Sequence, residues 1–497
     1  MRRFLAAGAL LIAAAALPAG TISKTPQHDY DRFEKKLSKD QSILHALNRL
    51  TFGPRPGDVA AVKKLGIEKW IDVQLHPDRL AENPDLESRL ARNASRQETA
   101  GKQGKQVAPA QYAQEKIYRA VYSNRQLQEV LVDFWYNHFN VDMSKGADRN
   151  LTPAYERDAI RPNVLGKFRD LLEATATSPA MLFYLDNWQS VAVDPTLERR
   201  LKGKRAGRGL NENYGRELME LHTLGVDGGY TQKDVTEVAR CFTGWTIDSP
   251  RQQGVFMFRP AMHDNSEKTV LGVDIPAGGG KEDGEKVLDI LARHPSTARF
   301  ISKELAQRFV ADDPPPILIH RMAQTFQQTD GDIRAVLTTM FESKEFFSQG
   351  AFRAKMKTPL ETVVSAVRAT GARVDSAGAL VNQIATLGEP LYRKIEPTGY
   401  SNLNAEWVNS SALLARMNFA MQLGQNRVAG VQLDPSRFSN KPSAAARQVL
   451  FSDASPQTLQ AIDKELSAEK RKNPRRPPPS GALIAGLAIG SPDFQRR

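Results

Sequence analysis

The sequence predicts a mainly α-helical, multi-helical protein with one small β-hairpin. Apolar residues recur at three- and four-residue spacing through several long segments, which is the pattern of one buried helix face. Glycine and proline fall between these segments, where they end helices. Cys241 is the only cysteine, so an intramolecular disulfide is excluded and the fold depends on its core. A chain of 497 residues buries roughly three quarters of its unfolded surface, which is enough to stabilise a fold without disulfides.

The predicted elements follow from local patterns. Apolar stripes predict helices over residues 43–50, 127–138, 301–309 and 333–340. Residues 255–258 (Val-Phe-Met-Phe) and 268–271 (Lys-Thr-Val-Leu) are β-like, and we expect them to pair as a hairpin across a long loop. Cys241 lies in a helical pattern beside Val238 and Phe242, which predicts a buried, inert thiol.

The first twenty residues have the layout of a cleavable signal peptide. Met1-Arg2-Arg3 is basic, residues 4–17 are uncharged and rich in Ala and Leu, and small residues follow. The apolar run is shorter than the roughly 20 residues that a membrane-spanning helix needs. The sequence therefore predicts a signal peptide over 1–20 and a single helical unit over 21–497, with 40–225 and 226–497 as candidate lobes. The protein is expected to be periplasmic or secreted, with no membrane span.

The net charge of +12 indicates the kind of partner. Exported proteins seldom meet nucleic acid, so we expect no nucleic-acid partner. An anionic envelope polymer, anionic lipid head groups or an acidic protein fit a basic surface. Two basic runs, 199–208 and 470–476, are rich in Gly or Pro, and we expect both to be solvated loops.

Several enzyme classes are disfavoured because their motifs are missing. The chain has no Gly-x-Ser-x-Gly elbow, Walker loop, His-Glu-x-x-His or Cys-x-x-Cys-His motif. It also lacks the Glu-x-x-His pair of ferritin-like di-iron sites.

Residues 211–225 form the densest candidate block. We expect a helix that begins at Asn211 or Asn213 and ends at Gly225 in the left-handed conformation. Arg216 and Glu220 are four residues apart and are expected to pair. His222 lies at the edge of the apolar face that includes Leu218. It is either a structural histidine near a helix C-terminus or a metal ligand or general acid–base.

Two other histidines are expected to complete a site. His138 precedes Asp142 by four residues, a workable chelate spacing on a helix, and His263-Asp264 lies in the loop between the two predicted strands. If His138, His222 and His263 converge, they form a catalytic or metal site. The predicted catalytic residues are His138, Glu217, Glu220, His222, His263 and Asp264. The predicted binding residues are Trp135, Asn137 and Arg216. The predicted ligands of a divalent metal ion are His138, Asp142, His222 and His263.

Segments along nearly the whole mature chain resemble the family known as domain of unknown function 1800. The segments are 45–57 (His-Ala-Leu-Asn-Arg-Leu-Thr-Phe-Gly-Pro-Arg-Pro-Gly), 134–139 (Phe-Trp-Tyr-Asn-His-Phe), 211–225, 242–245 (Phe-Thr-Gly-Trp) and 491–497. The resemblance implies a large exported bacterial protein without an assigned activity. It also implies an exported phosphatase- or sulfatase-like partner, because such proteins are often encoded beside members of this family. Relatives often carry Ala where this chain has Gly215, which indicates a close helix approach.

Three functions remain open at this point. The first is an exported enzyme of hydrolase or lyase type, with or without a divalent metal, acting on an anionic extracellular polymer or ester. The second is a non-catalytic binding or assembly protein that works with the phosphatase/sulfatase-like partner. The third is a structural envelope protein held by its basic loops. A cavity where the histidines and carboxylates meet favours the first, and an apolar or basic patch without such a site favours the second.

Overall fold

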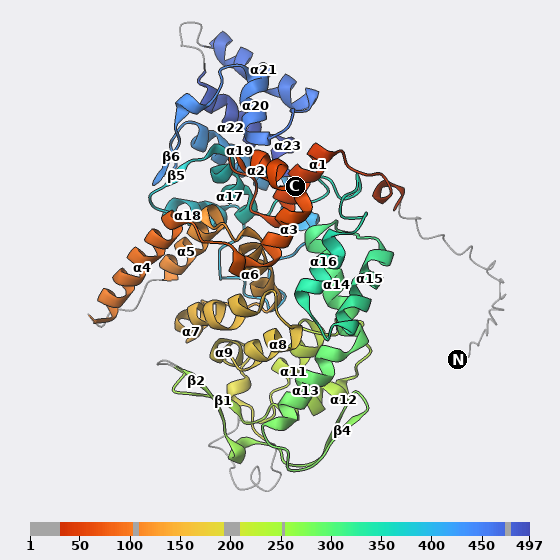
Figure 1. Ribbon diagram of the computed structural model, residues 1–497. Coiled ribbons are helices and arrows are strands. Elements are labelled where there is room, and N and C mark those ends of the chain that lie inside the picture. The colour runs from red at the N-terminus through yellow and green to blue at the C-terminus, as the bar shows by residue number, and fades with distance from the viewer. Residues whose placement is uncertain (1–29, 103–108, 193–208, 251–253, 473–478) are drawn as a thin grey trace, which may run out of the picture.

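A computed structural model describes residues 30–102, 109–192, 209–250, 254–472 and 479–497 (Figure 1). The predicted signal peptide and the basic run 199–208 lie outside these residues, as do residues 473–476 of the second basic run. The described residues are mainly helical, so the predicted fold class is confirmed.

The helices follow one another along the chain with short connections. The first group is α1 (Lys39–Leu50), α2 (Asp58–Leu65), α3 (Ile67–Leu75), α4 (Pro84–Lys102), α5 (Pro109–Tyr122), α6 (Gln126–His138), α7 (Asp148–Ala154), α8 (Phe168–Ala176) and α9 (Pro179–Tyr184). The second is α11 (Asn213–Glu220), α12 (Gln232–Cys241), α13 (Glu282–Arg293), α14 (Pro295–Phe309), α15 (Pro316–Gln328) and α16 (Ile333–Phe341). The third is α17 (Pro359–Thr370), α18 (Gly378–Thr386), α19 (Ser410–Gly424), α20 (Pro442–Leu450), α21 (Pro456–Lys472), α22 (Gly481–Ile489) and α23 (Pro492–Gln495).

The β-structure consists of three two-stranded antiparallel sheets in the described residues, and the predicted pairing is wrong. Strand β2 (Val255–Phe258) pairs with β1 (Trp245–Asp248), and β3 (Lys268–Val270) pairs with β4 (Val273–Ile275). Strand β5 (Arg373–Val374) pairs with β6 (Val431–Gln432). Leu271 and Gly272 connect β3 to β4 with φ of 50° and 78°. Positive φ at both turn positions is the geometry that closes a two-residue hairpin, so β3 pairs locally rather than with β2.

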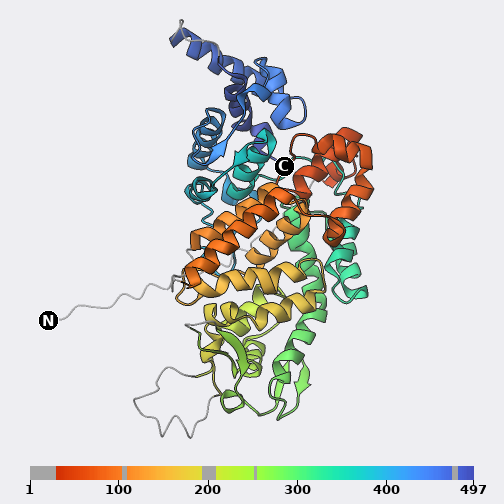
Figure 2. The ribbon, with the colours of Figure 1, turned by 60° about the vertical axis from the view of Figure 1, so that its left-hand side comes forward.

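The helices form an elongated body (Figures 1 and 2). Helices α20–α22 lie at one end, and β1–β4 with α11–α13 lie at the other. One hydrophobic cluster extends through this body and includes residues from Phe33 to Phe494. Helix α6 lies at its centre, since its side chains from Gln126 to Tyr136 are buried with the exception of Gln128. The central position of α6 fixes the place of its last residue, His138.

Gly215 and Cys241 both lie where helices pack closely. A Cβ added at Gly215 would lie 3.1 Å from the Val235 carbonyl oxygen and the Ala239 nitrogen, so glycine permits the close approach of α11 to α12. Cys241 is fully buried, as predicted.

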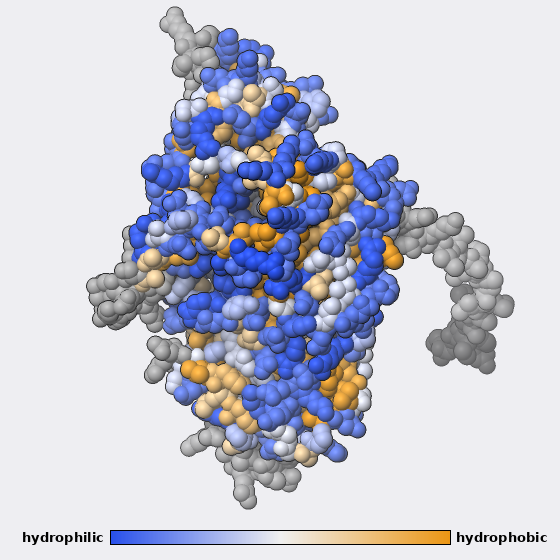
Figure 3. All heavy atoms as spheres, viewed as in Figure 1, coloured by the Kyte–Doolittle hydropathy of each residue, from blue (hydrophilic) through white to orange (hydrophobic). Residues whose placement is uncertain are grey.

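The surface is largely hydrophilic on the face shown in Figure 3, with apolar residues gathered around the positions of α3 and of β1 and β2. Among the described helices, none combines the length and the apolar composition needed to cross a membrane.

Candidate functional site

His138 is the last residue of α6, and four aromatic rings surround it. Its imidazole centroid lies 4.6 Å from Phe139, 5.4 Å from Trp135, 6.1 Å from Phe300 and 6.3 Å from Phe134. Burial among these rings lowers the pKa of His138 to about 4, and the hydrogen bond to His222 opposes this only in part. The imidazole is therefore neutral at pH 7.

The structure brings His222 next to His138. Nε2 of His138 lies 3.1 Å from the carbonyl oxygen of His222, and the two ring centroids are 6.3 Å apart. A carbonyl only accepts, so Nε2 carries the hydrogen, and Nδ1 carries the free lone pair. Burial lowers the pKa of His222 to about 3, with a further contribution from His138. Nε2 of His222 is buried without a hydrogen-bond partner.

The end of α11 explains how the His222 carbonyl reaches His138. The backbone N–H groups of Leu221 and His222 both donate to the Glu217 carbonyl, so the chain leaves the regular helix there. Gly225 follows with φ of +82°, the predicted left-handed conformation, but α11 ends at Glu220 rather than at Gly225 as predicted. A Cβ at Gly225 would lie 2.8 Å from the Phe300 ring. Glycine therefore lets Phe300 pack near His138.

A cavity of about 320 Å³ lies beside His138. Its walls come from the end of α6, from Leu221, from α14 and from the segment 398–403. The lining residues are Phe134, Asn137, His138, Leu221, Phe300, Glu304, Gln307, Thr398, Gly399, Tyr400, Ser401, Asn402 and Leu403.

The 398–403 wall packs tightly on the end of α6. Gly399 has φ of +66°, and a Cβ there would lie 2.1 Å from the Asn137 carbonyl oxygen, so no other residue fits without displacement. The Asn137 side-chain oxygen accepts from the Tyr400 N–H at 3.3 Å. Asn137 thus lines the cavity and also holds its wall.

The other side of this wall is fixed by an ion pair. Nζ of Lys355 donates to the Asn402 carbonyl at 2.5 Å and pairs with the Asp312 carboxylate. The second oxygen of Asp312 accepts from the Asn404 N–H at 2.9 Å. The wall is therefore positioned by α6 on one side and by Lys355 and Asp312 on the other.

Glu304 contributes the carboxyl group of the cavity. Burial raises the pKa of Glu304, and Lys303, Asn402 and Lys355 oppose this only in part. A carboxyl with a raised pKa stays protonated to higher pH than an ordinary glutamate, so a larger fraction of it can act as a proton donor. The cavity thus combines a neutral imidazole with a carboxyl whose pKa is raised.

Other predicted residues lie outside the cavity lining. Burial raises the pKa of Glu217, and the neighbouring charge of Glu220 adds to this. Glu220 accepts from the Tyr230 hydroxyl at 3.2 Å. Trp135 is fully buried in the core, where its indole N–H donates to the Val164 carbonyl at 3.3 Å.

The predicted pairing of Arg216 is wrong. Its guanidinium pairs with Glu212 at 3.5 Å and donates to Gln232 at 2.9 Å rather than to Glu220. Glu212 lies one turn before Arg216, and Gln232 begins α12 beside it. These two acceptors compete with Glu220, which is held by Tyr230.

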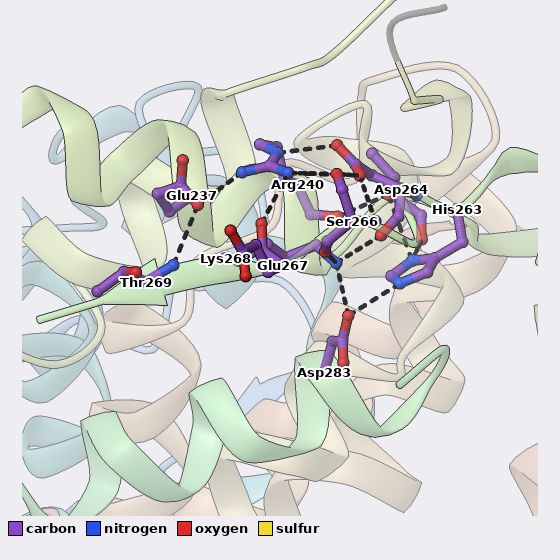
Figure 4. Close-up of polar contacts among 10 residues, drawn as sticks. Glu237, Arg240, His263, Asp264, Ser266, Glu267, Lys268, Thr269 and Asp283 are labelled. Atoms are coloured by element: carbon purple, nitrogen blue, oxygen red, sulfur yellow. Dashed lines mark hydrogen bonds and ion pairs between the residues drawn. The ribbon is translucent and has the colours of Figure 1, made fainter. Parts of the chain in front are cut away.

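His263 lies in a separate polar network (Figure 4). Its Nδ1 lies 2.8 Å from the Thr243 carbonyl, and its Nε2 lies 3.1 Å from the Asp283 carboxylate. Nζ of the buried Lys268 pairs with the same carboxylate at 2.6 Å. The prediction that His263 converges with His138 and His222 is wrong, because these partners bind both of its ring nitrogens.

Asp264 belongs to the same network and has a cationic partner. Oδ2 of Asp264 lies 2.8 Å from Nε of Arg240, which also pairs with Glu237 at 2.7 Å. Hydrogen bonds from Arg240 and Ser266 hold the pKa of Asp264 below its usual range, although burial acts in the opposite direction. This network connects α12 to the β3 region.

The four predicted metal ligands do not form one group. Asp142 accepts from the Ser144 hydroxyl and backbone, both within 2.8 Å. Across the described residues, no three His, Cys, Asp or Glu side chains are placed to hold a metal ion. The predicted metal centre thus has no geometric support here.

Sequence reasoning missed Glu304, Gln307 and the 398–403 segment. Glu304 precedes the apolar Leu305 on a predicted helix, which left it looking like an ordinary solvated residue. The turn-forming run Pro397-Thr398-Gly399-Tyr400 was the available signal, because binding and catalytic residues are disproportionately found on loops.

Comparison with known proteins gives one match. No curated protein and no solved structure matches the chain. The model of the family described as protein of unknown function DUF1800 matches residues 45–496. The matched region includes every residue of the cavity, and the chain belongs to the DUF1800 family.

Proposed function

We propose that the chain is an exported enzyme of hydrolase or lyase type that acts on an extracellular ester or anionic polymer. One observation carries the proposal: His138 and Glu304 line the same cavity, one as a neutral base and the other as a carboxyl with a raised pKa. Burial lowers the pKa of the imidazole and raises that of the carboxyl, so both groups favour their neutral forms, one as a proton acceptor and the other as a proton donor. The cavity volume lies in the roughly 300–1,000 Å³ range of small-ligand sites.

The proposed roles of His138 and Glu304 follow from which of their atoms can take or give a proton. Nδ1 of His138 takes a proton, either from a water molecule that attacks an ester or from a carbon beside a carboxylate in an elimination. Glu304 gives its proton to the oxygen of the leaving group. The new negative charge on Glu304 then favours the imidazolium form of His138. Amide groups of Asn137 and Gln307 supply donors that orient an anionic substrate.

The proposed export and substrate class have separate support. Residues 1–20 have the layout of a signal peptide. The net charge of +12 favours anionic partners through long-range attraction.

The test is turnover by the purified full chain on a panel of nitrophenyl esters and anionic polysaccharides. We expect His138→Ala and Glu304→Gln each to lower kcat by about a hundredfold or more, as for lost acid–base groups. His320→Gln and Glu342→Gln, which change exposed side chains outside the cavity, are the matched controls. Turnover that survives both cavity substitutions contradicts the proposal, and so does a lack of turnover across the panel.

A second function has its own observation. Several apolar side chains are exposed on α19 and in the segment before it, namely Leu403, Val408, Leu413, Leu414 and Met417. An exposed apolar group of this kind favours a protein contact. The binding or assembly protein, working with a phosphatase/sulfatase-like partner, is therefore the alternative. It predicts that Leu414→Glu abolishes partner binding while the cavity variants leave binding unchanged.

A further inference from the structure

Two buried arginine side chains bind one carboxylate in the interior, and a third buried arginine adjoins them. Arg49 is on α1, Arg308 is on α14, and Arg497 follows α23, and each is at most 4% exposed. Arg308 Nη1 lies 2.5 Å from Oε1 of Glu361, and Arg497 Nε lies 3.0 Å from Oε2 of the same residue. We call Arg49, Arg308 and Arg497 the arginine cluster.

Arg49 adjoins this group but has no carboxylate partner among the described residues. Its Nη2 donates to the carbonyls of Val310 at 3.1 Å and Ala351 at 2.5 Å. Burial lowers the pKa of Arg49, and the nearby charge of Arg497 lowers it further. The three guanidinium groups therefore repel one another at close range.

The charges of the arginine cluster are not balanced by nearby acids. Glu361 offsets one of the three positive charges. Asp312 is already paired with Lys355, and Asp133, which attracts Arg308 and Arg497, is paired with Lys116. Glu389 also attracts Arg308, but burial raises its pKa to about 8, so most of it is uncharged at pH 7. A charge buried without a partner is strongly unfavourable, so a stable fold requires further negative charge at this place.

Each guanidinium of the arginine cluster also has unused hydrogen-bond donors. Nε and Nη1 of Arg49, Nη2 of Arg308 and Nη1 of Arg497 are buried without a hydrogen-bond partner. His45 is buried beside Arg49: burial and then Arg49 lower its pKa, and a backbone contact with Phe346 opposes this in part. Buried donors in folded proteins are nearly always bonded. A water molecule supplies an acceptor but no charge, whereas an anion supplies both.

We propose that the arginine cluster binds a small monovalent inorganic anion of the chloride class, held by the free N–H groups of Arg49, Arg308 and Arg497. We favour a single-atom anion because the three arginine side chains are almost completely buried and a larger ion would need more room. The ring of Phe346, 4.7 Å from that of His45, makes the surroundings partly apolar, which favours an ion that gives up water easily. The anion is a structural ligand that joins α1, α14 and Arg497, which follows α23. This site is independent of the proposed acid–base cavity.

The first test is thermal unfolding of the full chain in sodium chloride and in sodium gluconate at equal ionic strength. A ligand that binds only the folded state lowers the unfolding constant by about a hundredfold at a concentration of 100 Kd. We expect the unfolding midpoint to rise with chloride and to stay flat with gluconate. Equal responses to the two salts overturn the proposal.

A variant pair separates the site from general destabilisation. Arg49→Met removes two of the free donors and is expected to abolish the chloride response. Arg368→Met removes another fully buried arginine, which donates to the Gly53 and Val121 carbonyls outside the cluster. It is expected to lower the midpoint but to keep the chloride response. A chloride response that persists in Arg49→Met overturns the proposal.

The second test does not require any variant to fold. Crystals of the unmodified chain grown in sodium bromide are expected to show an anomalous peak in contact with Arg49 Nη1 and Arg497 Nη1. Density at that position without anomalous signal identifies water and overturns the proposal.

Discussion

Nε2 of His138 lies 3.1 Å from the backbone carbonyl oxygen of His222, and this contact determines which nitrogen of His138 is free. The end of α6 meets the irregular end of α11 at this point, so two distant helices together define one tautomer. The Nδ1 lone pair then belongs to a ring whose neighbours are mostly aromatic. The chemistry proposed for the cavity depends on that arrangement.

The histidine pair predicts a specific pH dependence. The pKa of His138 is lowered to about 4 and that of His222 to about 3, both below the ordinary value of 6.5. The unfolded chain therefore binds more protons between pH 6.5 and 4, and the free energy of unfolding falls as pH falls through this window. The slope is about 1.4 kcal/mol per pH unit for each proton taken up.

Nitrogen-resolved NMR of the histidine rings checks this directly. Both rings are expected to stay neutral down to about pH 5, with the hydrogen of His138 on Nε2. The exposed His320 is the internal reference for the measurement. Protonation of His138 near pH 6.5, or a hydrogen on Nδ1, contradicts the geometry.

Gly399→Ala is expected to displace the cavity wall. The added Cβ would lie 2.1 Å from the Asn137 carbonyl oxygen, so the 398–403 segment has to move. We expect a loss of about 2–4 kcal/mol in the free energy of unfolding, as for other backbone and packing conflicts. Gly388→Ala is the control, because its φ is also positive but its Cβ meets nothing within 4 Å. Equal losses in the two variants in urea denaturation would mean that only backbone strain matters.

Lys268→Met is expected to weaken the fold without affecting the cavity. The change leaves the buried Asp283 carboxylate with His263 alone. Removing one partner of a buried ion pair lowers the free energy of unfolding by about 3–5 kcal/mol. Arg157→Met, which breaks an exposed pair with Asp158, is expected to cost about 1 kcal/mol or less. Similar costs for the two variants would show that Lys268 is not held as the structure has it.

Lys355→Met is expected to loosen the cavity from its other side. The substitution removes the donor to the Asn402 carbonyl and leaves Asp312 without its cation. Substrate affinity is expected to fall by about tenfold or more, because the wall loses its fixed position. Hydrogen exchange of residues 398–404 is the measurement. Unchanged protection of this segment would rule out the positioning role of Lys355.

Local patterns predicted the helices well and the cavity poorly. Ile43, Leu47 and Leu50 are buried on α1, because their spacing alone selects one helix face. The β-pairing was wrong since the Leu271-Gly272 turn was not recognised as a hairpin signal. His138 and His222 were singled out from the sequence, but Glu304 and Tyr400 were missed. The walls of the cavity come from four separate segments, and no periodicity relates one segment to another.

The tight contact between Gly399 and Asn137 has a consequence for the newly made chain. The bonded pair Asn137 and Tyr400 are separated by 263 residues in the sequence. Contacts between residues so far apart in the sequence are slow to form, because closing a long loop costs conformational entropy. A partly synthesised chain therefore has His138 but no enclosed cavity around it. Any activity of the cavity is expected to appear only once residue 400 and its neighbours have folded against α6, so refolding experiments should recover helical content before they recover function.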